Sequence, residues 1–217
     1  MLLRRLGNKT KMANKIMKFA PPHTLYIEPF FGAGGMFFNK KKARYNIVND
    51  QDSEVFNLFQ ILMNNKQELI NMLLLMPVHQ DLWNYWKLNK EIDPVKKAVR
   101  FLMLSNFGLY GKPDTLRYNG GNASQILLED IEQAYKFMYG VEFMNCDFRV
   151  MFDKISLRDN QRKEHVFIYA DPPYLETTCY EQHFTEKDSA DLFDILQSTR
   201  AKWAMSEFDQ PIYFKRG

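Results

Sequence analysis

The chain has 217 residues, of which 46% are hydrophobic, so it can bury the core of one domain, or of one domain with a substantial insertion. Its longest strongly apolar stretch, residues 70–76, is too short to cross a bilayer, and no secretory signal is expected after Met1. The net charge of +3 hides an asymmetry, because residues 1–44 carry +9 and residues 45–217 carry −6. The two cysteines and four histidines lack disulfide or metal-ligand spacing, so we expect a reduced, cytoplasmic protein without a metal site.

Five short apolar runs predict strands, and they cover residues 24–28, 45–49, 141–145, 166–170 and 202–206. Because the runs are nearly continuous rather than alternating, they are typical of a parallel sheet that is covered on both faces. Thr185 and Asp188 have the spacing of a capping box, which predicts a helix over residues 189–199. The alternation of strands and helices predicts an α/β fold.

Helical patterns fill residues 53–140, between the second and third predicted strands. One helix is predicted over residues 53–62 with Ser53 as its cap, and another over residues 67–76. Asp93-Pro94 predicts a third helix start, because aspartate caps helices and proline at the first helical position loses no needed N–H group.

Residues 108–122 are rich in turn formers and predict a long loop or a hairpin, which usually has a function when it is that long. Trp83, Tyr85 and Trp86 are expected in the core of the helical region. The expected domain organisation is a catalytic domain of residues 1–52 and 141–217 with a largely helical insertion of residues 53–140.

A glycine-rich turn follows the first predicted strand and contains Phe30, Gly32 and Gly34. Glycines let the backbone approach a ligand and aim a helix N-terminus at negative charge, although an ordinary strand-to-helix turn has the same composition. The spacing does not match the dinucleotide pattern Gly-x-Gly-x-x-Gly, since the third glycine is Gly35. This argues against a typical nicotinamide enzyme.

Asp50 ends the second predicted strand, where a carboxylate can bind both hydroxyls of a ribose that lies over the glycine turn. Asp52 is a nearby competitor for this role. The alternative is that Asp50 caps the helix that begins at Ser53. Spacing alone leaves both interpretations open.

The tetrapeptide Asp171-Pro172-Pro173-Tyr174 closes the apolar strand 166–170, at the edge where ligands bind in open α/β folds. The prolines fix the backbone, so the carboxylate of Asp171 and the carbonyl of Pro172 form a rigid pair of acceptors. Such a pair suits an exocyclic NH₂ group, and Tyr174 offers a face for a planar base. An ordinary Pro-Pro turn would need neither the preceding acid nor the following aromatic residue.

The order of Phe30-x-Gly32-x-Gly34, Asp50 and Asp171-Pro-Pro-Tyr174 resembles the Dam-type (D12 class) DNA adenine-N6 methyltransferase family. The N-terminal segment Leu6-Gly-Asn-Lys9-Thr10-Lys11 is similar to a signature of the same family. The resemblance spans residues 4–206 and implies a Rossmann-like S-adenosylmethionine-dependent methyltransferase sheet with a helical target-recognition insertion.

The resemblance also implies roles for further residues. Asp147-Phe148 is similar to the family's acidic-aromatic pair that holds the adenine of the cofactor, and Lys9 is expected near the cofactor or the target base. Arg117, Asn119 and Asn122 resemble the loop that the family inserts into DNA, although turn-forming residues of a surface loop explain them nearly as well.

The implied activity is site-specific transfer of a methyl group from S-adenosylmethionine to adenine in double-stranded DNA, without a metal. The adenine would be flipped out of the duplex, and family resemblance makes GATC the first target to consider. Such an enzyme would be bacterial or phage-encoded and serve DNA methylation or restriction–modification. The basic N-terminal segment suits phosphate contacts, although a charge run is more often a solvated helix face.

Two alternatives stay open. The acid-Pro-Pro-Tyr pattern also suits amino methylation of RNA or of protein. The family continues through further strands after the position of Gly217, so the chain is either a short enzyme or a catalytically impaired or truncated homologue that binds DNA.

Overall fold

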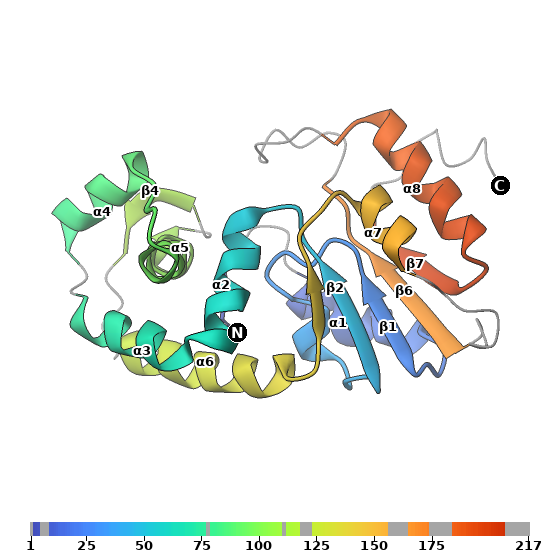
Figure 1. Cartoon of the computed structure of the whole chain (residues 1–217), viewed down its shortest axis with the longest axis horizontal. Coiled ribbons are helices and arrows are strands. Elements are labelled where there is room, and N and C mark those ends of the chain that lie inside the picture. Colours follow the sequence, from blue (N-terminus) through green and yellow to red (C-terminus); the bar gives the residue numbers. More distant parts are fainter. Residues whose placement is uncertain are drawn as a thin grey trace. The chain divides into compact units, whose positions relative to one another are not determined.

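The computed structural model describes the chain at residues 2–4, 9–76, 79–109, 112–117, 123–155, 165–173 and 184–206. Within these residues, five strands form one sheet, and every neighbouring pair runs parallel (Figure 1). The strands are β1 (Leu25–Glu28), β2 (Tyr45–Asn49), β5 (Glu142–Met144), β6 (Val166–Ala170) and β7 (Lys202–Met205). The predicted bounds of β2 and β6 are confirmed residue for residue, and the other three strands are one or two residues shorter than predicted.

The order of the strands across the sheet is β5-β2-β1-β6-β7. Counted along the chain, this is the order third, second, first, fourth, fifth, which is the Rossmann arrangement. The chain moves from β1 outward through β2 to β5 and then returns to place β6 on the other side of β1. The predicted α/β, Rossmann-like fold is therefore confirmed, and its topological switch point lies between β1 and β6.

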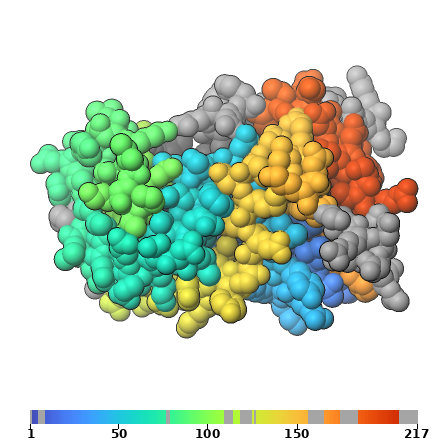
Figure 2. All heavy atoms as spheres, in the orientation of Figure 1, coloured from blue at the N-terminus to red at the C-terminus, as the bar shows by residue number. Residues whose placement is uncertain are grey.

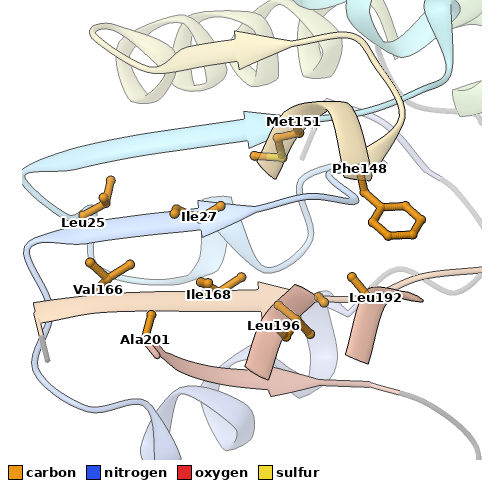
Figure 3. Close-up of a cluster of buried hydrophobic side chains, with 10 residues drawn as sticks. Leu25, Ile27, Phe148, Met151, Val166, Ile168, Leu192, Leu196 and Ala201 are labelled. Carbon is orange, nitrogen blue, oxygen red and sulfur yellow. The ribbon is translucent and has the colours of Figure 1, made fainter. Parts of the chain in front are cut away.

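One face of the sheet is covered by α7 (Phe148–Lys154) and α8 (Glu186–Ser198) (Figures 1 and 3). Alternate residues of a strand point to the same face, so β1 and β6 present matching apolar side chains to these helices. Figure 3 shows the resulting cluster, whose buried members include Leu25, Ile27, Met151, Val166, Ile168, Leu192 and Leu196. Burial of side chains of this size contributes about 1.5–3 kcal/mol each, which fixes the two helices on the sheet.

The other face of β1 and β6 carries aromatic and polar side chains. The rings of His23, Tyr26 and Phe167 lie within 5.4–6.2 Å of one another. The hydroxyl of Tyr26 donates to the buried carboxylate of Glu28 at 2.8 Å. Burial, together with the nearby charge of Glu28, raises the pKa of Tyr26 well above its ordinary value, so the hydroxyl keeps the proton that it donates.

Helix α8 begins at the predicted capping box. The Thr185 side chain accepts from the Asp188 N–H group, and the Asp188 carboxylate accepts from the Thr185 N–H group at 2.8 Å. The helix starts at Glu186, three residues before the predicted start at residue 189. Atoms of α7 and α8 lie side by side at the surface (Figure 2).

A second group of elements is largely helical, as predicted for residues 53–140. It contains α2 (Ser53–Asn64), α3 (Lys66–Leu75), α4 (Gln80–Leu88), α5 (Pro94–Phe107), the antiparallel strands β3 (Gly108–Leu109) and β4 (Lys112–Leu116), and α6 (Ala123–Met138). Helix α5 packs against α2, α3, α4 and β4, and it is buried along most of its length. No helix in the described ranges is long and apolar enough to cross a membrane.

Helix α4 corrects one prediction about the core. Trp83 and Trp86 are buried as expected, but Tyr85 is 53% exposed. Residues three positions apart share a face of a helix, whereas Tyr85 lies on the opposite face of this short helix. An aromatic run that lacks helical spacing cannot be buried as a whole.

The helix starts confirm one prediction and correct another. The Asp93 side chain accepts from the Lys96 N–H group at 2.8 Å, so Asp93-Pro94 starts α5 as predicted. Helix α2 is capped by Asp52 rather than by Ser53, because the Asp52 side chain accepts from the Glu54 N–H group at 2.9 Å. Aspartate and serine are comparable caps, and the extended backbone at Asp52 decides between the neighbours.

The contacts of the described residues divide the chain into two compact units. The helical unit comprises Met1–Met17, Gly32–Lys42 and Asp52–Val141, and the sheet unit comprises Lys18–Phe31, Ala43–Gln51 and Glu142–Gly217. The longest segment of the helical unit, Asp52–Val141, extends one residue beyond each end of the predicted insertion. Residues 1–17 and 32–42, which the prediction placed in the catalytic domain, also belong to the helical unit. That the insertion recognises a DNA target stays a prediction.

The helical unit also contains α1 (Thr10–Ile16) and the short 3₁₀ helix η2 (Phe37–Asn39), while the 3₁₀ helix η1 (Met17–Phe19) follows α1 directly. Two lysines near η2 lie against aromatic rings: Lys40 lies over Phe37 at 5.3 Å, and Lys42 lies over Phe137 at 5.8 Å. Lys42 also donates to the Tyr139 carbonyl, and burial lowers its pKa. These two lysines therefore have packing roles.

Candidate functional site

The carboxyl ends of β1, β2 and β6 lie at one edge of the sheet, because these strands are parallel neighbours. The chain leaves this edge at Phe30, two residues after β1, at Asp50, directly after β2, and at Asp171, directly after β6. The fold thus brings three predicted site residues from distant parts of the sequence to the edge that contains the switch point. Ligands of open α/β sheets bind at such edges.

Asp171 follows a strand whose position is firmly set. All five residues of β6 are buried, and the Ser206 N–H group donates to the Ala170 carbonyl at 2.9 Å, which extends the pairing with β7 to the last residue before Asp171. The Oδ1 atom of Asp171 is buried, and so is Pro172. The tetrapeptide of residues 171–174 therefore starts from a fixed backbone. Its last residue, Tyr174, lies outside the described residues.

Three phenylalanine rings gather at the same edge. The ring of Phe30 lies 5.6 Å from that of Phe148 and 5.9 Å from that of Phe184, and the latter two are 6.2 Å apart. Tilted and edge-on pairs at these distances are favourable aromatic contacts. Phe30 is half-buried, whereas Phe148 is only 4% exposed, so Phe148 serves as much in the core as at the edge.

Asp147 lies at the start of α7, and Arg149 contacts its carboxylate. The Asp147 carboxylate caps the helix by accepting from the Arg149 N–H group at 2.8 Å, and it also lies 3.2 Å from the Arg149 guanidinium. The guanidinium contacts Asp188 and Asp191 of α8 and lies 4.4 Å from the ring centre of Phe148. One side chain thus joins the predicted acidic-aromatic pair to the start of α8.

The charges of this cluster are mutually stabilising. Burial alone would lower the pKa of Arg149, but the hydrogen bonds that it donates to Asp188 and Asp191 raise it above its ordinary value. Burial alone would raise the pKa of Asp188, but hydrogen bonds from Thr185 and Arg149 lower it. Arg149 and Asp188 therefore stay ionised at neutral pH, and their ion pair holds α7 and α8 together.

Asp50 is half-buried, and its backbone is held on both sides. Its N–H group donates to the Met144 carbonyl at 3.2 Å, and its carbonyl accepts from the Asn145 side chain at 2.7 Å. The helix cap is Asp52, so the alternative in which Asp50 caps α2 is wrong. The ribose-binding role of Asp50 stays a prediction.

The glycine turn has the backbone that its composition predicts. Gly32 and Gly34 adopt φ angles of +55° and +70°, a region that other residues avoid. Lys9 directly precedes α1, where its carbonyl accepts from the Met12 and Ala13 N–H groups at 2.8 Å each. Its side chain is buried, which does not suit a contact with a surface phosphate.

The predicted DNA-contacting residues are described only in part. Arg117 is exposed just after β4, and its N–H group donates to the Phe107 carbonyl at 2.9 Å. Asn119 and Asn122 lie outside the described residues. Lys11 and Lys15, which share a face of α1, are both exposed.

The described residues contain no group of three or more His, Cys, Asp or Glu side chains that could hold a metal ion. The polar groups described at the sheet edge are carboxylates and backbone carbonyls, and aromatic rings lie beside them. The oxygens can accept hydrogen bonds from the hydroxyls and amines of a nucleoside, and the rings can contact its planar base.

Two residues of this edge were not anticipated from the sequence. Phe184 completes the aromatic group, and Arg149 binds the acids of α7 and α8. Arg149 could have been identified from its place directly after the acidic-aromatic pair Asp147-Phe148, where a basic side chain can reach the acid. No local pattern marks Phe184, because its partners Phe30 and Phe148 are far away in the sequence.

A model of the family described as D12 class N6 adenine-specific DNA methyltransferase matches residues 6–213. A DNA adenine methylase from Haemophilus influenzae is 29% identical over 194 residues, which cover 79% of this chain and 63% of that protein. A DNA adenine methylase from Salmonella typhi is 32% identical over 123 residues, which cover 54% and 43% respectively.

A DNA adenine methylase from Escherichia coli K12 is 25% identical over 215 residues, which cover 90% of this chain and 74% of that protein. The matches to the Haemophilus and Salmonella proteins therefore span less than two thirds of their lengths, at 63% and 43%. The family match, in contrast, covers nearly the whole of this chain.

Proposed function

Because the chain belongs to the D12 class N6 adenine-specific DNA methyltransferase family, we propose that it transfers a methyl group from S-adenosylmethionine to the exocyclic amino group of adenine in duplex DNA. The observation that carries the proposal is the position of Asp171, directly after β6 and beside the switch point of a Rossmann-ordered sheet. A carboxylate at that position faces the region where such sheets bind their ligands.

The chemical difficulty lies in the amine, whose lone pair is delocalised into the purine. Asp171 and the Pro172 carbonyl accept hydrogen bonds from the two amine hydrogens, which localises the lone pair and stabilises the positive charge that develops on nitrogen. The nitrogen would form its new bond to the methyl carbon as the bond between that carbon and the sulfonium sulfur breaks, which would leave S-adenosylhomocysteine, and the methylated nitrogen would then lose one proton to water. Pro173 keeps the two acceptors rigid, and Tyr174 stacks on the flipped adenine.

S-adenosylmethionine, when bound, supplies a methyl group that is already activated on a sulfonium centre. The residues at the sheet edge fit its nucleoside part: Asp50 offers a carboxylate for the ribose hydroxyls, and Phe30 offers a half-buried ring for the base. Asp147 and Phe148 hold the other side of the base. From their positions in the sequence motifs, we also assign Lys9, Gly32 and Gly34 to cofactor binding.

Replacing Asp50 and Asp52 separately distinguishes ribose binding from helix capping. Asp50→Ala is expected to weaken the Kd for S-adenosylmethionine about 10- to 100-fold, because charge-assisted hydrogen bonds to two hydroxyls are lost. Asp52→Ala is the matched control and is expected to lower the free energy of unfolding by about 1 kcal/mol, since it removes the cap of α2. Titration calorimetry and urea unfolding measure the two effects, and equal cofactor affinities would contradict the assignment of Asp50.

The substrate side of the proposal rests on the exposed basic residues and the loop after β4. Arg117, Asn119 and Asn122 read base edges, and Lys11 and Lys15 contact phosphates. Binding through phosphates weakens steeply as salt rises. GATC is the first target sequence to test.

The experiment that tests the function offers labelled S-adenosylmethionine to the chain with one of several polymers. These are a duplex containing GATC, the same duplex with that site scrambled, an RNA hairpin and a denatured protein. Label in the first duplex, recovered as N6-methyladenine, is the expected result. Label only in RNA or protein would replace the proposed substrate, and DNA binding without transfer would favour a non-catalytic homologue.

A further inference from the structure

One side chain at the carboxyl edge of the sheet joins the segments that leave three neighbouring strands. Asn49 is the last residue of β2 and is 1% exposed. Its Nδ2 atom donates to the Pro29 carbonyl and to the Cys146 carbonyl, each at 3.0 Å. Its Oδ1 atom accepts from the Cys146 N–H group at 3.1 Å. The amide therefore links the ends of β1, β2 and β5.

Each linked position lies directly before a residue that we assign to the cofactor. Phe30 follows Pro29, whose carbonyl accepts from Asn49. Asp147 follows Cys146, which Asn49 binds through both its N–H and its carbonyl group. Asp50 follows Asn49 itself. The backbone supports the same arrangement, because the Phe31 N–H group donates to the Asn49 carbonyl at 2.8 Å. The spacing of the three assigned residues thus depends on one buried amide.

The hydrogen-bond donors and acceptor of an asparagine side chain match the backbone groups at this position in number and in kind. It offers two N–H hydrogens and one carbonyl oxygen, and it meets two carbonyls and one N–H group. Aspartate keeps the acceptor but cannot donate, and alanine satisfies none of the three backbone groups. Buried backbone groups that lose their partner move to find another, or they remain unsatisfied at a cost.

We infer that Asn49 is a positioning residue for the cofactor pocket, which sets the distances between Phe30, Asp50 and Asp147 without contacting the cofactor. This inference rests on the proposed function. A side chain that fixes several binding groups acts mainly on affinity, because each group contributes only when all are in place.

The test compares Asn49→Ala with Asn46→Ala in the full chain. Asn46 is the matched control, because it lies on the same strand, is 3% exposed and donates to the Ala43 carbonyl at 2.9 Å, but lies at the opposite end of β2. Titration calorimetry with S-adenosylmethionine gives the Kd, at a temperature well below the melting temperature of each variant. Asn49→Asp, which keeps the acceptor for the Cys146 N–H group, is measured in the same way and replaces the alanine variant if that variant does not fold.

We expect Asn49→Ala to weaken the Kd about tenfold or more, while Asn46→Ala binds within about twofold of the unaltered chain even where its melting temperature falls. In Asn49→Ala the KM for the cofactor should rise together with the Kd, and kcat at saturating cofactor should change much less. Cofactor affinity that is unchanged in both Asn49 variants would overturn the inference. Absence of binding by the unaltered chain would overturn the proposed function, and the inference with it.

Discussion

Asp171→Ala is expected to lower the rate of methyl transfer about 10²- to 10³-fold while cofactor affinity stays close to that of the unaltered chain. The variant removes the carboxylate that we propose accepts from the adenine amine, and such an interaction strengthens as positive charge develops on nitrogen. A single-turnover assay with labelled S-adenosylmethionine and duplex DNA measures the rate, and titration calorimetry measures the affinity.

The structure explains why this change should act on chemistry rather than on folding. Residue 171 lies outside the hydrogen-bonded strand, which ends at Ala170 and is held there by the Ser206 N–H group. Asp171→Asn keeps the shape and one oxygen acceptor but removes the charge, so its rate should fall between those of the alanine variant and the unaltered chain. Glu142→Ala, an exposed acid at the start of β5, is the control. A rate in Asp171→Ala equal to that of this control would exclude the proposed role.

The sheet was predictable because most residues of its central strands are buried. Residues 45–49 and 166–170 form short runs rich in apolar residues, and the structure begins and ends β2 and β6 at those residues. Strand β5 lies at the edge of the sheet and pairs only with β2 among the described strands, so pairing ends sooner than the apolar pattern does. Strand order was not predicted, since it depends on contacts between segments far apart in the sequence.

The site residues divide in the same way. Asp50, Asp171 and the glycine turn were identifiable from local sequence, because special residue types follow a strand at fixed spacing. The supporting contacts were not, since Asn49 acts on segments near residues 29 and 146, and Arg149 reaches residues 188 and 191. A one-dimensional pattern identifies which residues could carry chemistry, but the residues that hold them become evident only from the fold.

Arg100→Met is expected to lower the free energy of unfolding of the helical unit by about 3 kcal/mol. Arg100 of α5 is 9% exposed, and its Nη1 atom lies 3.2 Å from the Glu54 carboxylate of α2. Its Nε atom donates to the Trp86 and Asn89 carbonyls at 3.0 and 2.8 Å. Methionine has a similar length but no donor, so the largely buried Glu54 carboxylate loses the nearer of its two cations and the end of α4 loses its donor.

Urea unfolding of Arg100→Met and of Lys97→Met compares the contribution of this buried cation to the free energy of unfolding with that of a more exposed cation. The Lys97 amine lies 4.0 Å from the same Glu54 carboxylate, and its side chain is more exposed than that of Arg100. Loss of this longer ion pair should cost less than about 1 kcal/mol. Equal destabilisation by the two substitutions would show that the packing of α5, rather than the hydrogen bonds of Arg100, stabilises the unit.

The double variant Arg100→Met/Glu54→Gln identifies which partner of Arg100 matters more. Neutralising Glu54 removes a charge that has lost its nearer cation, but it leaves the Trp86 and Asn89 carbonyls without the Nε donor. We therefore expect partial recovery, to about 1–2 kcal/mol below the unaltered chain. Full recovery would mean that the carbonyls find water at no cost, and no recovery would mean that the ion pair contributes nothing. Either result would contradict our interpretation that Arg100 stabilises the unit both through its ion pair with Glu54 and through its hydrogen bonds to the end of α4.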